Sequence, residues 1–190
     1  DVAFAVERLA GRVAVGTVIG FPHGTTSTAA KVAEAQQAVT DGAQELDMVL
    51  NIGWLRSGLF DEVVSDIAAV VAVSQGRVVK VILETVFLSD EQIVAACQVS
   101  TAAGAQFVKT STGFAGGGAS IEHVSLMRSN IGPGLHVKAS GGVRSLETLL
   151  ALQAAGATRF GTSSTAQILD EVAAREAGVE YRHVKDAPGY

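Results

Sequence analysis

Two lysines stand at corresponding places in two short segments rich in β-branched and small residues. Lys109 lies in Gln106-Phe-Val-Lys-Thr-Ser-Thr-Gly113, and Lys138 lies in His136-Val-Lys-Ala-Ser-Gly-Gly-Val-Arg144. Lysine is almost never buried without a reason, and burial together with a second ammonium nearby lowers the pKa of a lysine. A neutral amine can then attack a carbonyl carbon. The pair therefore predicts Schiff-base chemistry on neighbouring strands.

The rest of the chain alternates short apolar runs with segments of helical periodicity. We expect six strands, at residues 13–21, 44–50, 78–84, 106–110, 135–139 and 158–161. Helices are predicted at residues 2–9, 26–40, 61–74, 90–103, 121–130, 146–154 and 164–176. This alternation predicts βαβ units and a parallel sheet. The predicted fold class is α/β, a TIM (β/α)8-type barrel of which six β/α units are present.

A short repeat links three of these units. In each of them a Gly-Ala dipeptide closes the helix and opens the next strand, beginning at Gly42, Gly104 and Gly156. Five residues beyond these glycines stand Asp47, Lys109 and Gly161. Because the offset is constant, the three positions are predicted to lie at equivalent depths near the carboxyl ends of their strands, where α/β barrels carry their sites.

Charged residues on alternate strand positions suggest a shared interior. Asp47, Lys80, Lys109 and Lys138 come from four successive predicted strands. If those strand faces point into a barrel, the four side chains converge, and unpaired buried charges are too costly to be kept for packing alone. The alternative is that some of these lysines extend outward between the helices and keep their ammonium groups in water.

Two glycine-containing loops follow the last two predicted strands. They are Gly141-Gly142-Val143-Arg144 and Gly161-Thr162-Ser163-Ser164. Backbone N–H groups at such loops bind anions, and (β/α)8 barrels often bind phosphate after strands seven and eight. The six strands are then the third to the eighth, and two are absent. Alternatively, the glycines mark tight turns, the serines are helix caps, and Arg144 contacts a surface carboxylate.

The composition limits the possible functions. At 190 residues the chain fits one domain, residues 1–190, and its net charge of -5 argues against binding to nucleic acid or an anionic membrane. The four histidines and the single cysteine, Cys97, show no metal-ligand spacing, so we predict no metal, and Cys97 is expected to pack in the core. Residues 113–118 lack the spacing of a dinucleotide fingerprint, and we predict no cofactor.

The beginning of the chain suggests a shortened barrel. It starts at Asp1, already inside the predicted helix at residues 2–9, so we expect the native N-terminus to be missing. No signal peptide is visible, which favours a cytoplasmic protein. Apolar helix faces and an open sheet edge predict a homo-oligomer, most simply a dimer.

Five segments in register resemble the deoxyribose-phosphate aldolase family. They are Glu45-Leu-Asp-Met-Val-Leu-Asn-Ile-Gly53, Val79-Lys-Val-Ile-Leu-Glu-Thr85, Phe107-Val-Lys-Thr-Ser-Thr-Gly113, Val137-Lys-Ala-Ser-Gly-Gly-Val-Arg144 and Gly161-Thr-Ser-Ser164. The resemblance implies a (β/α)8 barrel whose first strand, first helix and second strand are absent here.

The resemblance also implies roles for individual residues. Lys109 matches the Schiff-base lysine, Lys138 the second lysine, and Asp47 the proton-relaying aspartate. Lys80 matches a supporting lysine, and Tyr190 is a weaker candidate for proton transfer from the C-terminal tail. The residues that match or flank the phosphate loops are Gly113, Gly141, Gly142, Val143, Arg144, Gly161, Ser163 and Ser164.

The reaction implied by the resemblance needs no cofactor. It is the reversible cleavage of 2-deoxy-D-ribose 5-phosphate to D-glyceraldehyde 3-phosphate and acetaldehyde through a lysine Schiff base. Two alternatives remain open on the residues alone. One is another class I aldolase acting on a different phosphosugar, and the other is a phosphosugar-binding fragment without catalytic activity.

Overall fold

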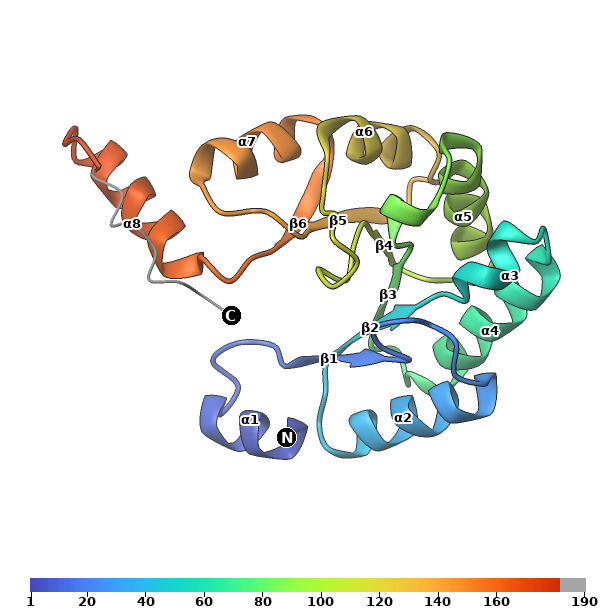
Figure 1. Ribbon diagram of the computed structural model, residues 1–190. Helices are drawn as coiled ribbons and strands as arrows, with labels where there is room; N and C mark the ends of the chain where they lie inside the picture. Colours follow the sequence, from blue (N-terminus) through green and yellow to red (C-terminus); the bar gives the residue numbers. More distant parts are fainter. Residues whose placement is uncertain (182–190) are drawn as a thin grey trace.

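The computed structural model describes residues 1–181, and within them six strands form one parallel sheet in the order of the sequence. The strands are β1 (Gly16–Ile19), β2 (Glu45–Val49), β3 (Val78–Ile82), β4 (Phe107–Lys109), β5 (His136–Ser140) and β6 (Ala157–Gly161). They form an arc with the helices on its outer side (Figure 1). Sequential parallel pairing is the arrangement of a (β/α)8 barrel, so the sheet is a partial barrel.

Helices connect each strand to the next, and two further helices precede β1 and follow β6. The longer ones are α1 (Val2–Leu9), α2 (Thr28–Thr40), α4 (Phe60–Val73), α5 (Asp90–Ala102), α6 (Ile121–Ser129), α7 (Leu146–Ala154) and α8 (Thr165–Glu176). The six predicted strands and seven predicted helices are confirmed, with bounds that differ by a few residues. Several of these helices begin at a serine, such as Ser27 and Ser89, whose hydroxyl accepts a backbone N–H of the first turn.

Two further helical segments were not predicted from the sequence. They are α3 (Ile52–Arg56), directly after β2, and the 3-10 turn η1 (Thr85–Phe87), directly after β3. Segments this short contain too few residues to show a helical period. Both lie at the carboxyl ends of their strands, and they therefore shape the edge of the sheet where a site is expected.

The hydrophobic core lies between the sheet and the helices. Strand residues that alternate with the charged ones, such as Leu46, Met48, Val79 and Val81, are fully buried against the helices. Cys97 of α5 belongs to this core, and burial raises the pKa of its thiol to about 12. The face of the sheet that the helices cover is thus apolar, and Cys97 packs in the core as expected.

The two end strands, β1 and β6, each pair with one neighbour among the described residues. Val18 of β1 is 41% exposed, although it lies in register with Asp47 of the next strand. Helix α8 projects beyond the end of the arc (Figure 1) and is tied to α7 by Glu171, which accepts the backbone N–H of Leu146. No helix within residues 1–181 is long and apolar enough to cross a membrane.

Candidate active site

The register of the strands stacks the inward-facing side chains in layers. Asp47 pairs with Lys80, and Lys80 pairs with Phe107, so Lys109 stands two residues farther along β4. A closed eight-stranded barrel of this type is staggered by one residue per strand. Over the two strands from β2 to β4 the stagger amounts to two residues, which equals the offset of Lys109 from Phe107. Asp47 and Lys109 therefore reach the same level inside the sheet.

The same stagger explains the repeat of three glycines. Lys109 pairs with Lys138, and Ser140, two residues farther along β5, pairs with Gly161 of β6. Asp47, Lys109 and Gly161 thus come from alternate strands and share one layer, as side chains do in barrels of this class. The constant five-residue offset in the sequence has its physical basis in this layering.

Three lysines converge on one carboxylate. The Oδ2 atom of Asp47 accepts hydrogen bonds from the Nζ atoms of Lys109 at 2.8 Å and Lys138 at 2.7 Å. Its Oδ1 atom accepts one from the Nζ atom of Lys80 at 2.7 Å. The four side chains are buried or largely buried. The lysines therefore point into the barrel, and the alternative of outward-pointing lysines is wrong for this set.

The charges of this cluster shift the pKa values of its members. Burial disfavours the ionised form of Asp47, but Lys109, Lys138 and Lys80 outweigh burial and hold its pKa well below the ordinary value of 3.8. Burial also lowers the pKa of Lys138, and the nearby ammonium of Lys109 acts in the same direction against the attraction of Asp47. The site thus favours the ionised form of the Asp47 carboxylate and disfavours the charged form of the Lys138 amine beside it.

The two glycine-containing loops lie next to each other. Thr162 donates a hydrogen bond from Oγ1 to the carbonyl of Val143 at 2.6 Å. A Cβ atom on Gly161 would stand 2.8 Å from the Cβ of Ser140, so only glycine allows β6 to approach β5 this closely. Gly141 has φ 85°, within the left-handed region that favours glycine. The two loops are therefore held side by side.

Ser163 and Ser164 lie at the start of α8. Ser164 precedes the first helical residue, and its side chain makes no capping hydrogen bond. The N–H groups of the first helical turn have no partner within the helix, and they attract anions. Arg144 is exposed beside these loops, whereas Val143 is buried under them. The serine pair thus marks the N-terminal end of a helix facing the glycine loop.

Gly113 begins a third loop, which returns to the first one. Ala119 donates its backbone N–H to the carbonyl of Gly141 at 3.0 Å, and the Cβ position of Gly118 is filled by the same peptide. On its other side the loop is held by Thr112, whose N–H and hydroxyl both donate to Glu84. The structure thereby brings the segment of Gly113 beside the two predicted phosphate loops.

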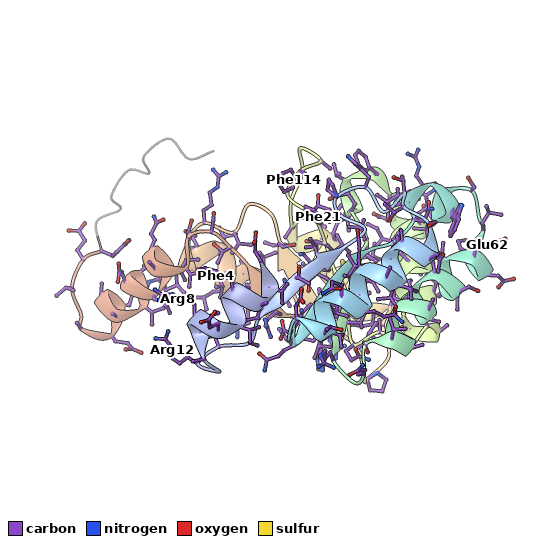
Figure 2. All side chains as sticks on the ribbon, turned by 90° about the horizontal axis from the view of Figure 1, so that it is seen from below. Phe4, Arg8, Arg12, Phe21, Glu62 and Phe114 are labelled. Atoms are coloured by element: carbon purple, nitrogen blue, oxygen red, sulfur yellow. The ribbon has the colours of Figure 1, made fainter. Side chains whose placement is uncertain are left out.

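A cavity of about 430 Å³ lies at the carboxyl ends of β1 to β4. Its lining includes Pro22, Ile52, Arg56, Glu84, Phe87, Thr112 and Phe114. The rings of Phe21 and Phe114 meet edge to face with centroids 5.4 Å apart (Figure 2). Both unpredicted segments, α3 and η1, contribute to the lining. The cavity is open on the same edge of the sheet as the charged cluster.

Two further predictions concern a metal and the C-terminus. Within residues 1–181 no group of three or more His, Cys, Asp or Glu side chains is arranged to hold a metal ion. Tyr190, the weaker candidate for proton transfer, lies outside the described residues.

Comparison with known proteins places these residues in a family. The family model described as DeoC/LacD family aldolase matches residues 2–170. The chain belongs to this family of aldolases. A deoxyribose-phosphate aldolase of Staphylococcus epidermidis is 57% identical over 169 residues, which cover 88% of this chain and 77% of that protein. Deoxyribose-phosphate aldolase 1 of Staphylococcus aureus is 55% identical with the same coverage.

A solved structure supports the fold of this aldolase. The deoxyribose phosphate aldolase from Aeropyrum pernix, described as a unique tetrameric structure, superposes with a TM-score of 0.81 at 35% sequence identity. The superposition covers 92% of this chain and 73% of that one. The partial barrel of this aldolase therefore has the family architecture over most of its length.

Two charged residues beside the cluster, the largely buried Glu45 and the more exposed Arg159, were not among the predicted site residues of this aldolase. Glu45 accepts a hydrogen bond from the Nζ atom of Lys80 at 2.8 Å and two from Arg159, at 2.7 and 2.8 Å. Each precedes by two residues a position of the five-residue repeat, Asp47 or Gly161. Side chains alternate along a strand, so this spacing predicts that Glu45 shares a strand face with Asp47 and, by the same rule, Arg159 with Gly161.

Proposed function

We propose that this aldolase catalyses the reversible cleavage of 2-deoxy-D-ribose 5-phosphate to D-glyceraldehyde 3-phosphate and acetaldehyde, with Lys109 forming the Schiff base. The observation that supports this most strongly is the pairing of Lys109 and Lys138 on one oxygen of an ionised Asp47. The names of the relatives supply the substrate. The arrangement provides the amine and the proton-transfer groups that the reaction needs.

The first half of the reaction breaks a carbon–carbon bond. The neutral Nζ of Lys109 adds to the C1 carbonyl of the open-chain sugar, and loss of water gives an iminium ion. A base removes the proton of the C3 hydroxyl. The C2–C3 bond then breaks, its electron pair enters the iminium to form an enamine, and glyceraldehyde 3-phosphate leaves. The positive iminium nitrogen thus serves as the electron sink.

The second half of the reaction regenerates the lysine. The enamine takes a proton at its terminal carbon, and water hydrolyses the resulting iminium to release acetaldehyde. We assign these proton movements to Asp47 and Lys138, because a carboxylate that stays ionised and an amine with a lowered pKa lie on either side of the same hydrogen bond. Lys80 holds the other oxygen of Asp47 and fixes its orientation.

The phosphate group is assigned to the loops at the other end of the substrate. Its proposed partners are the backbone groups of Gly113, Gly141, Gly142, Val143, Gly161, Ser163 and Ser164, with the Arg144 guanidinium beside them. These loops are joined by hydrogen bonds and adjoin the start of α8, which suits an anion. Binding there orients the sugar so that C1 reaches Lys109.

The organisation of the whole protein follows from this proposal. We propose a single barrel domain over residues 1–190 that works in the cytoplasm as a homo-oligomer, most simply a dimer. Phe4 of α1, 66% exposed, and Val18 at the open edge of β1 are apolar surfaces that an assembly would cover. Light scattering during size-exclusion chromatography measures the mass, and a monomer at micromolar concentration would contradict the proposed assembly.

Trapping the intermediate tests the proposed reaction. The protein is incubated with acetaldehyde and reduced with borohydride, and the added two-carbon mass is located by peptide mapping. We expect the adduct at Lys109 and its loss in Lys109→Leu. Lys31→Met is the matched control, because Lys31 is a buried lysine on the outer side of the sheet and its loss should leave the adduct unchanged.

The same experiment separates the alternatives. An adduct with a different donor aldehyde, and none with acetaldehyde, would indicate another class I phosphosugar aldolase. Binding of deoxyribose 5-phosphate without any adduct would indicate a phosphosugar-binding protein. For the phosphate loops, kcat/KM in the synthesis direction should be much larger for glyceraldehyde 3-phosphate than for unphosphorylated glyceraldehyde. Equal values would contradict the assignment of those loops.

A further inference from the structure

We propose that Glu45 and Arg159 are positioning residues that set, through Lys80, the pH range in which Lys109 is reactive. The inference deepens the proposed function and rests on it for its meaning. Neither residue forms a hydrogen bond or an ion pair with Asp47 in the described part of the structure, and neither is among the groups assigned to the reaction above. Their effect is exerted from the layer of side chains directly beneath the lysines.

A continuous line of ion pairs runs from Arg159 through Glu45 and Lys80 to Asp47. Arg159 donates to both carboxylate oxygens of Glu45, and the Oε2 atom of Glu45 accepts from Lys80. Lys80 is 1% exposed and donates in turn to the Oδ1 atom of Asp47, whose other oxygen accepts from Lys109 and Lys138. A change of charge at Glu45 is therefore transmitted through one buried ammonium to the reactive amines.

The strand register accounts for this line. Glu45, Phe107 and Arg159 each precede by two residues a member of the layer that contains Asp47, Lys109 and Gly161. They consequently form the layer below. Lys80 comes from β3, between the two levels, and so reaches a carboxylate in each.

The cluster carries more positive than negative charge. Four cations, Lys80, Lys109, Lys138 and Arg159, meet two carboxylates, Glu45 and Asp47. Burial opposes ionisation of Glu45, but Lys80 and Arg159 outweigh it and hold the pKa of this carboxyl below its ordinary value. Glu45 therefore contributes a fixed negative charge at neutral pH.

The groups that face this pair come from every neighbouring strand. The charged or titratable ones are Asp47 of β2, Lys80 of β3, Lys109 of β4, and His136 and Lys138 of β5. From β1 the nearest residue is Gly16, where a Cβ would stand 3.4 Å from that of Glu45. The His136 ring packs against Phe107, with centroids 5.2 Å apart.

The two residues should act in opposite directions. Replacing Glu45 by glutamine removes a negative charge, which favours neutral amines and moves the reactivity of Lys109 to lower pH. Replacing Arg159 by methionine removes a positive charge and moves it to higher pH. We expect a shift of about one pH unit for Glu45 and about half a unit or less for Arg159, whose charge lies closer to water. If the two substitutions only disturbed packing, they would lower the reaction rate but would not shift the pH dependence in opposite directions.

Competitive labelling of lysines measures the pH dependence of Lys109 reactivity without requiring turnover. Wild type, Glu45→Gln, Arg159→Met and Arg159→Lys are treated with a trace of acetic anhydride at a series of pH values, and the acetylation of Lys109 is quantified by peptide mass. We expect the midpoint of the Lys109 curve to fall in Glu45→Gln, to rise in Arg159→Met, and to stay unchanged in Arg159→Lys, which keeps the charge. The acid limb of kcat/KM should move with the midpoints.

The outcomes separate this inference from the proposed function. Midpoints that do not move, or that move in the same direction in Glu45→Gln and Arg159→Met, overturn the inference even if the enzyme is active. If Glu45→Gln does not fold, the comparison of Arg159→Met with Arg159→Lys decides, because Arg159 is largely exposed and its loss leaves Glu45 paired with Lys80. A protein that forms no borohydride adduct fails the proposed function, whatever the labelling curves show.

Discussion

Two buried clusters in this protein use the same chemical groups in different proportions. Between α2 and α4, Lys31 donates to Asp66 at 2.5 Å, and Thr28 donates to the second oxygen of Asp66 at 2.7 Å. The two charged side chains are 0% and 1% exposed. Inside the barrel, by contrast, Asp47 accepts from three lysines. The first cluster has one cation for each carboxylate, whereas the second has an excess of cations.

The difference distinguishes a structural role for the helix pair from the chemical role proposed for the barrel cluster. A balanced pair with its hydrogen bonds satisfied holds two helices together and has no reason to lose a proton. An excess of ammonium groups around one carboxylate disfavours the charged form of the amines and so makes one of them available as a nucleophile. The barrel cluster is therefore expected to be less favourable for stability than the helix pair, and under the proposed function the same excess of ammonium groups prepares one lysine to react with a carbonyl.

The largest effect is expected for Lys109→Leu. Loss of the nucleophile should lower kcat for cleavage of deoxyribose 5-phosphate by about 10,000-fold or more, since no Schiff base can form. The circular dichroism spectrum should be unchanged, because removing one ammonium leaves Asp47 with two others. A coupled assay of glyceraldehyde 3-phosphate release measures the rate. Activity within tenfold of wild type would show that another lysine forms the Schiff base.

Asp47→Asn should damage both activity and stability. We expect a loss in kcat of about 100- to 10,000-fold, because the proton-transfer group is removed. Three ammonium groups lose their common carboxylate, which should lower the free energy of unfolding by about 3–5 kcal/mol. Urea unfolding measured by fluorescence tests the second part. A variant as stable as wild type would mean that the lysines find other partners.

The free energies of unfolding of wild type and Asp47→Asn should depend differently on pH in acid. The pKa of Asp47 is lower in the folded protein than its ordinary value of 3.8, so its ionised form stabilises the fold above that pH. This contribution is lost as the pH falls below 3.8 toward the lower folded-state value. The gap in unfolding free energy between wild type and Asp47→Asn should therefore narrow on acidification, and a gap that stays constant from pH 6 to pH 3 would contradict this.

Lys31→Met tests the ion pair between α2 and α4, and it should lower stability without lowering activity. It leaves Asp66 buried without its cation, which should lower the free energy of unfolding by about 3 kcal/mol. The kcat of the folded variant should stay within about twofold of wild type, because the pair lies on the outer side of the sheet. The double variant Lys31→Met with Asp66→Leu should recover most of the stability. A large loss of kcat in folded Lys31→Met would contradict the conclusion that the pair of Lys31 and Asp66 has only a structural role.

The smallest effect is expected for the stability of Lys138→Met. The pKa of Lys138 is lower in the folded protein than its ordinary value of 10.5, so the charged lysine destabilises the fold at neutral pH. The variant should melt at a higher temperature than wild type at pH 7. That advantage should disappear as the pH rises past 10.5, where the lysine is neutral in both states. Differential scanning calorimetry at the two pH values checks it.

The local sequence determined the order of helices and strands and the common level of Asp47, Lys109 and Gly161 inside the barrel. Buried parallel strands must be apolar on the side facing the helices, so residues such as Leu46 and Val81 alternate with Asp47 and Lys80. The glycine at the end of each helix fixes where the next strand begins, and the fifth residue beyond it then falls at a constant height. For this reason the convergence of Asp47 and Lys109 could be predicted without any coordinates.

The three-dimensional structure alone decided which charges share which atoms. Glu45 and Arg159 are 114 residues apart, and a register shift between Val137 and Lys138 on β5 sets where β6 lies in the ladder. The stagger of the strands then decides that Lys80 reaches two carboxylates while Lys109 and Lys138 share one oxygen. Strand composition specifies which faces are buried, but the distance between two side chains across a barrel depends on stagger and curvature, which no local pattern encodes.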